Sequence, residues 1–136
     1  MIAMPMDAKM VTRFLNEYLD GFAACVRGEQ DIATLSAFYG VPLIITSDDG
    51  VIALTTDGDV TTVIQGQVDG LRALRYHSTR VLQSEVISLN ATSALFRASL
   101  ARYDDKGDEI DCPTITYVVT DGDAGTRIMM LAAHGG

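Results

Sequence analysis

The sequence predicts an α+β domain in which three N-terminal helices pack on one face of a curved antiparallel sheet. Over residues 7–40 and 57–76 the apolar positions recur every three or four residues, as in helices that cover a core. From residue 80 onward the period is two, which is typical of strands. A chain of 136 residues has room for about one core. We therefore expect a tail over residues 1–6 and a single domain over residues 7–134.

The first two helices are expected over residues 7–27 and 31–40. Gly28 ends the first helix, and Asp31 is placed to cap the second, which closes at Gly40. Because the connection is short, we expect the two helices to pack antiparallel. The apolar stripe of the first helix consists of Val11, Phe14, Leu15, Tyr18, Leu19, Phe22 and Val26.

A short β-hairpin is expected after the second helix. Pro42 opens its first strand, Asp49 and Gly50 make the turn, and residues 51–54 form the returning strand. Both strands are rich in β-branched residues, which favours this interpretation.

The third helix is expected over residues 57–76, with Thr56 as its N-terminal cap. Gly66 and Gly70 lie inside it, and each costs about 1 kcal/mol relative to alanine. They indicate either that a neighbouring element approaches closely or that the helix bends.

Four strands joined by short polar turns complete the domain as an antiparallel meander. They are expected over residues 80–89, 94–103, 110–120 and 127–133. In the second of these strands, the alternating set Ala94, Phe96, Ala98 and Leu100 is apolar and is expected to face the helices.

The outer face of this sheet is expected to pair with a second copy of the chain. In a monomer, one face of the sheet should contact water and carry polar side chains, but neither face of the third strand is strongly polar. We therefore expect a homodimer. The residues expected on this outer face are Leu95, Ile115, Tyr117 and Val119.

Composition excludes several classes of function. The formal net charge of −8 has the wrong sign for a surface that binds nucleic acid. No apolar run approaches the roughly 20 residues of a membrane span, and the N-terminus resembles no secretory signal, so we expect a cytoplasmic protein. Cys25 and Cys112 lack the spacing of a zinc site or a dithiol motif, and no metal or cofactor is expected.

Several segments, in their order, resemble the nuclear transport factor 2-like (NTF2-like) superfamily, which includes ketosteroid isomerase and the SnoaL-like polyketide cyclases. They are Val26-Arg27-Gly28-Glu29, Phe38-Tyr39-Gly40, Ala94-Leu95-Phe96-Arg97, the hairpin from Tyr103 to Ile110, and Gly125-Thr126-Arg127-Ile128. The resemblance covers nearly the whole chain. It implies a cone-shaped fold with a cavity between the helices and the sheet.

The catalytic residues of that superfamily are not carried over. The tyrosine and the two aspartates for which ketosteroid isomerase is known fall near Gly21, Thr46 and Thr116, which lack those groups. The paired histidines of a scytalone dehydratase and the aspartates bridged by arginine of limonene epoxide hydrolase have no counterpart either.

The remaining polar residues have simple structural interpretations. Asp48 and Asp49 fit a turn, and His77 fits the end of a helix. His134 is expected to fray, although it could line the mouth of the cone. Glu85 and Arg97 are expected to form a cross-strand ion pair, and the acidic residues between 104 and 111 to form a solvated hairpin tip.

We therefore expect the chain to bind a small apolar organic ligand in its cavity, without a recognisable catalytic set. The alternatives are an isomerase, cyclase or dehydratase with an atypical acid or base, and a protein-interaction module that uses the outer sheet face. The expected cavity residues are Tyr18, Phe22, Phe38, Phe96, Leu100, Cys112, Thr114 and Thr116.

Overall fold

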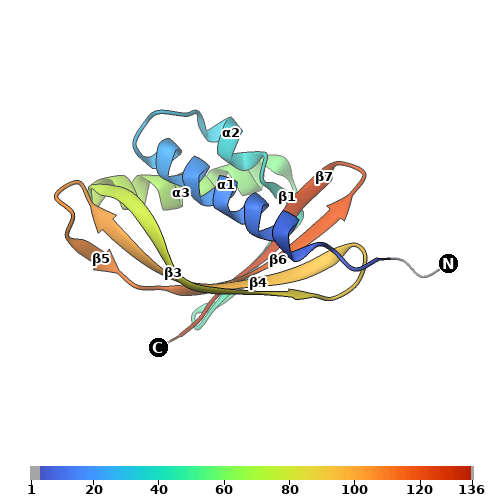
Figure 1. Ribbon diagram of the computed structural model, residues 1–136. Helices are drawn as coiled ribbons and strands as arrows, with labels where there is room; N and C mark the ends of the chain where they lie inside the picture. The colour runs from blue at the N-terminus through green and yellow to red at the C-terminus, as the bar shows by residue number, and fades with distance from the viewer. Residues whose placement is uncertain (1–3, 136) are drawn as a thin grey trace.

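In the computed structural model, which describes residues 4–135, three helices cover one face of a curved seven-stranded sheet (Figure 1). This arrangement confirms the predicted α+β class. The helices are α1 (Ala8–Val26), α2 (Ile32–Ser36) and α3 (Asp57–Ala73). The strands are β1 (Tyr39–Ser47), β2 (Gly50–Leu54), β3 (Tyr76–Ser88), β4 (Ser93–Asp104), β5 (Glu109–Asp111), β6 (Thr114–Gly122) and β7 (Gly125–Ala133).

The strand order across the sheet is β2-β1-β7-β6-β4-β3, and the short β5 pairs with β4. The strands from β3 to β7 form the predicted antiparallel meander. The hairpin of β1 and β2 extends this sheet, because β1 lies parallel to β7. The sequence does not predict this pairing, which joins segments about 85 residues apart.

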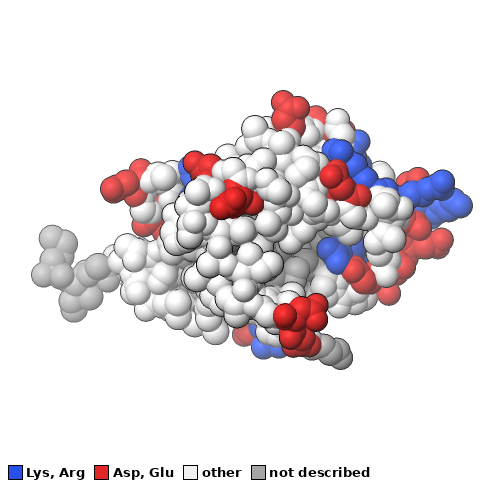
Figure 2. Space-filling model, turned by 180° about the vertical axis from the view of Figure 1, so that it is seen from behind, with Lys and Arg blue, Asp and Glu red and all other residues white. Residues whose placement is uncertain are grey.

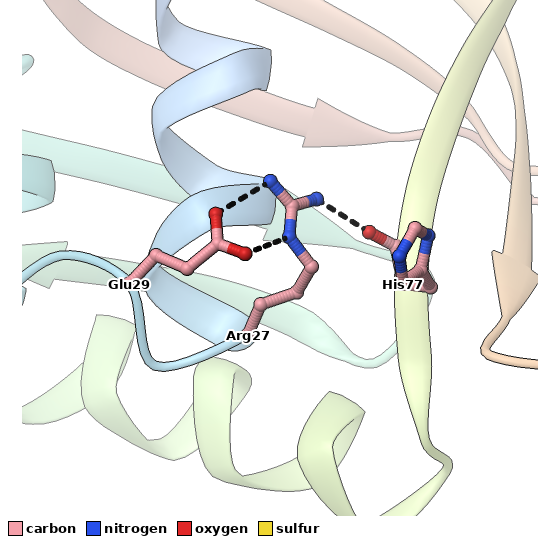
Figure 3. A network of polar contacts seen from close by, with 3 residues as sticks. All are labelled: Arg27, Glu29 and His77. Atoms are coloured by element: carbon pink, nitrogen blue, oxygen red, sulfur yellow. Dashed lines mark hydrogen bonds and ion pairs between the residues drawn. The ribbon is translucent and has the colours of Figure 1, made fainter.

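Both ends of α1 are fixed by specific contacts. The Asp7 carboxylate accepts a hydrogen bond from the Lys9 backbone N–H, and Gly28 adopts φ +80° just beyond the helix, as predicted. The Arg27 guanidinium binds Glu29 and donates to the His77 carbonyl at 2.7 Å, which ties the end of α1 to β3 (Figure 3). His77 therefore takes part in this contact through its backbone carbonyl.

The second helix is shorter than predicted and ends at Ser36. Tyr39 and Gly40 belong to β1, because the chain is already pairing with β7 here: the Phe38 carbonyl accepts from the Ile128 N–H at 2.8 Å. Met129 fills the space where a side chain on residue 40 would stand, which explains the glycine.

The third helix carries its predicted Thr56 cap but ends at Ala73, so that Tyr76 begins β3. A Cβ placed on Gly66 or Gly70 would meet nothing within 4 Å. Of the two explanations that the sequence left open, a close neighbour therefore does not account for these glycines.

The predicted strand 110–120 is broken into β5 and β6 at Cys112 and Pro113. Proline has no backbone N–H to donate to a neighbouring strand. The Pro113 carbonyl still accepts a hydrogen bond from the Leu100 backbone N–H at 2.8 Å.

The two faces of the sheet are set by the register of β4 with β6. Phe96 lies opposite Tyr117 and Ala94 opposite Val119, and all four side chains are buried under the helices. Ile115 shares this face, opposite Ala98. The prediction that placed Ile115, Tyr117 and Val119 on the outer face is therefore wrong, and only Leu95 of that set lies there.

The N-terminal segment packs more closely than a tail would. Met6 is buried, its N–H donates to the Asn90 carbonyl at 3.0 Å, and its carbonyl accepts from the Ser88 hydroxyl at 2.5 Å. Residues 1–3 of the predicted tail lie outside the described residues. Within residues 4–135, no helix combines the length and the apolar character that crossing a membrane requires.

Candidate functional site

A cavity of about 480 Å³ lies between α1, α3 and the inner face of the sheet. Its helical wall includes Leu19 and Phe22 of α1 and Leu71 of α3, and its sheet wall includes Leu100 of β4 and Leu131 of β7. Most of this lining is aliphatic or aromatic. The cavity has the size and the character of a small-molecule pocket.

Four of the eight residues expected in the cavity line it: Tyr18, Phe22, Leu100 and Thr114. Phe38 and Phe96 are not on its wall. Phe38 packs edge-on against Phe14 and Tyr18, and Phe96 is a core residue with 1% exposure that contacts Tyr117.

The other two expected residues lie elsewhere. Cys112 is exposed in the break between β5 and β6, where its thiol donates to Glu109 at 2.9 Å. Thr116 lies on the outer face, because the register of β6 with β4 pairs it with Arg97. Thr46 lies on the same face as Thr116, because Ala132 of β7 pairs with both residues. The cavity is therefore lined by Ile45, Ile115 and Tyr117 instead.

Arg102, Gln67 and Tyr117 also supply polar groups to the cavity, where the sequence did not predict them. Arg102 stands two positions beyond Leu100 on β4, so the same alternation that placed Leu100 inside could have found it. Gln67 lies four residues before Leu71 on α3, at the spacing of one helix face.

A cluster of buried tyrosines lies at the inner end of the cavity, where Tyr18 and Tyr117 reach its wall and Tyr39 contacts Tyr18 from outside the wall. The Tyr18 and Tyr39 hydroxyls are 2.5 Å apart, and the Tyr18 ring meets the ring of Tyr117 edge to face at 5.7 Å. Burial raises the pKa of Tyr18, Tyr39 and Tyr117 above the ordinary value of 10. At neutral pH these phenols are uncharged, so they can donate hydrogen bonds but cannot act as bases.

Arg102 brings a positive charge to the same end. Its Nε donates to Asp111 Oδ1 at 2.6 Å, and its Nη2 donates to Asp111 Oδ2. These hydrogen bonds raise the pKa of Arg102, so the guanidinium stays charged. Burial raises the pKa of Tyr18, and the positive charge of Arg102 partly opposes this rise. The electrostatic effect of Arg102 therefore reaches the tyrosine cluster.

The end of the chain lines the mouth of the cavity, where His134 is exposed. The His134 N–H donates to the Thr114 carbonyl at 3.0 Å, and its Nε2 lies 2.6 Å from Thr116 Oγ1. The prediction that His134 frays is therefore wrong, because these two bonds hold it at the mouth.

The charged groups outside the cavity have structural roles. Glu85 and Arg97 are directly opposite in β3 and β4, as predicted, but lie beyond ion-pair distance. Asp104 accepts from the N–H groups of Lys106 and Asp108 in the hairpin tip. Within residues 4–135, no three acidic, histidine or cysteine side chains gather as a metal site would require. Figure 2 shows acidic side chains at several separate places on one face.

Solved structures share this fold at low sequence identity. A Nostoc punctiforme protein of unknown function with a cystatin-like fold has a TM-score of 0.71 at 10% identity, over 96% of this chain and 94% of that one. An NTF2-like protein from Novosphingobium aromaticivorans gives 0.70 at 13% identity, over 94% and 80%. A putative calcium/calmodulin dependent protein kinase II association domain from Xanthomonas campestris gives 0.69 at 13%, over 99% and 94%.

Among the curated proteins, none matches this sequence. A family model does match, and it spans residues 7–136, which is nearly the whole chain. Its description, NTF2-like protein, agrees with the helices and the curved sheet described above. The chain belongs to this family of NTF2-like proteins, DUF6841.

Proposed function

We propose that the protein binds a small, largely apolar organic molecule in the cavity between the helices and the sheet. The observation that carries this proposal is the cavity itself: about 480 Å³ of space, walled mainly by apolar side chains, with a few polar groups among them. Pockets for small organic ligands have this composition and size.

The polar groups favour binding over acid–base catalysis. No aspartate or glutamate is among the described residues that line the cavity, and the nearby Asp111 carboxylate is held by Arg102. The buried phenols are uncharged at neutral pH because burial raises the pKa of each. An isomerase, cyclase or dehydratase would have to use His134, at the mouth, as its base.

Filling the cavity is expected to abolish binding. Gly70 lies on the cavity wall, and a side chain added there would meet no atom within 4 Å of its Cβ. Gly70→Phe should therefore project a ring into the space where the ligand would lie. The probe is N-phenylnaphthylamine, a neutral two-ring dye whose fluorescence rises in apolar surroundings. Titration should show saturable binding at one site in the wild type and at least about a tenfold loss in Gly70→Phe.

Gly66→Phe is the matched control, because Gly66 lies on the same helix, is equally uncrowded and is not on the cavity wall. It should bind the dye as the wild type does. Equal binding by all three proteins would place the dye outside the cavity and contradict the proposal, as would a wild type that does not bind.

We also propose that the outer face of the sheet pairs with a second copy of the chain. One apolar residue from each of six adjacent strands lines up there in a single row, as the strand registers place them. The row consists of Ile87, Leu95, Val118, Met130, Ile44 and Ala53. Glu85 and Arg97 flank it, opposite in sign and without an ion pair to each other. A patch that carries both signs can complement itself in a two-fold dimer.

Leu95→Lys is expected to convert this dimer into a monomer, because it places a charge within the apolar row, between Ile87 and Val118. Light scattering coupled to size exclusion measures the mass. Leu82→Lys is the control, since Leu82 is 52% exposed and outside the row. A wild type that is already a monomer would contradict the dimer and favour a module that docks a different protein on this face.

We propose the cytoplasm as the compartment. Both cysteines are unpaired thiols in the structure, Cys25 buried and Cys112 exposed. A reducing compartment keeps such thiols free.

A further inference from the structure

We infer that the ligand of the cavity is an organic anion, and that Arg102 is the residue that selects its charged end. This inference rests on the proposed function, since it specifies which molecules the same cavity takes. It concerns the polar inner end, where Arg102 and the tyrosines meet.

The charges around the cavity have the opposite sign to the rest of the chain. The protein carries 18 acidic and 10 basic residues, yet the described lining holds one arginine, one histidine and no carboxylate. An anion that enters therefore meets no like charge on the wall itself. It is drawn instead to the one permanent positive charge there.

Arg102 keeps donors available after it has bound Asp111. A guanidinium has five N–H groups. Asp111 takes one from Nε and one from Nη2, and Nη1 has no partner among the described residues. The Arg102 side chain is only 24% exposed, so an oxygen that reached it would bind in surroundings with little water. Hydrogen bonds between charged groups are strongest in such places.

The tyrosines complete a site for an acceptor oxygen. Tyr117 lies on the cavity wall beside Tyr18, and its hydroxyl is close enough to interact with the hydrogen-bonded hydroxyls of Tyr18 and Tyr39. Because it is uncharged at neutral pH, this hydroxyl can donate to an oxyanion. The apolar side chains of the helical wall, Leu19, Phe22 and Leu71, suit the body of the ligand.

Two dyes that differ only in charge test this inference. Anilinonaphthalene sulfonate has the same rings as N-phenylnaphthylamine and adds one sulfonate. Arg102→Gln should weaken binding of the sulfonate by about ten- to a hundredfold, because one charge-assisted hydrogen bond is lost, and leave the neutral dye unchanged. Arg80→Gln, the same substitution at an exposed position on β3, should change neither affinity.

Asp111→Asn gives the opposite result if the inference is correct. It removes the carboxylate that competes for Arg102 and keeps a side chain of the same size. Binding of the sulfonate should tighten by several-fold, while binding of the neutral dye stays constant. Circular dichroism and thermal unfolding of both variants check that each is folded.

The outcomes separate this inference from the proposed function. If both dyes bind, Gly70→Phe blocks both, and Arg102→Gln does not change their ratio of affinities, then the cavity binds ligands but does not select anions. If Arg102→Gln weakens both dyes equally, Arg102 acts only on the shape of the cavity, and the inference is again wrong. If neither dye binds the wild type, the proposed function fails and the inference fails with it.

Discussion

Phe96→Ala is expected to lower the free energy of unfolding by about 3–5 kcal/mol, which is a large part of the total stability of a domain this size. Phe96 lies on β4, between β6 and β3, and is 1% exposed. Its ring packs against that of Tyr117, with centroids 6.3 Å apart. Its removal would leave a void that neighbouring strands, fixed by their hydrogen bonds, could not close.

Urea unfolding followed by circular dichroism measures this loss. The control is Leu82→Ala, because Leu82 is 52% exposed on β3, and it should change the free energy of unfolding by about 0.5 kcal/mol or less. Equal effects of the two substitutions would show that β4 does not present Phe96 to the core.

The sequence could predict the parts of this fold that local chemistry determines. Asp7 and Thr56 cap their helices through side-chain hydrogen bonds, and Gly28 takes the left-handed conformation that ends α1. The alternation in β4 is clear because Arg97 interrupts one face while Phe96 belongs to an unbroken apolar set.

Contacts between distant segments could not be predicted in this way. Both faces of β6 are mixed, so its periodicity does not say which side is buried, and only its register with β4 places Tyr117 inside. The pairing of β1 with β7 has no local signal either. It carries Ile45 and Leu131 to the cavity wall.

In the candidate site, too, residues set by a local pattern could be predicted, whereas a residue held by a tertiary contact could not. Tyr18 and Phe22 were found because they belong to one helical stripe. Arg102 was missed because a charged residue near a strand end usually faces solvent, and it is the contact with Asp111, across the β4–β5 hairpin, that keeps it at the cavity.

The protein is expected to unfold steeply above pH 10, because the native state holds tyrosine protons that the unfolded chain releases. Burial raises the pKa of Tyr18, Tyr39 and Tyr117 in the folded protein, whereas the unfolded value stays near 10. Below pH 10 both states are protonated, so these residues make no pH-dependent difference. Above it, only the unfolded chain ionises, and each buried tyrosine then lowers the free energy of unfolding by about 1.4 kcal/mol per pH unit.

Three such tyrosines give a slope of about 4 kcal/mol per pH unit, which exhausts a stability of about 5–15 kcal/mol within a few pH units. The free energy of unfolding, measured with urea between about pH 8 and pH 11, gives this slope. Tyrosinate absorbance should rise together with the loss of circular dichroism, since the buried phenols ionise only when the chain opens.

Tyr39→Phe removes the contribution of one buried tyrosine to the pH dependence of the free energy of unfolding. Tyr39 is 5% exposed, lies off the cavity wall and shares its hydroxyl contact with Tyr18. Its replacement should lower the slope above pH 10 by about 1.4 kcal/mol per pH unit. The free energy of unfolding of the same variant at about pH 8 is the control, because it measures the lost hydrogen bond alone. A slope equal to that of the wild type would mean that the native state does not hold the Tyr39 proton, and that its hydroxyl reaches water in the folded protein.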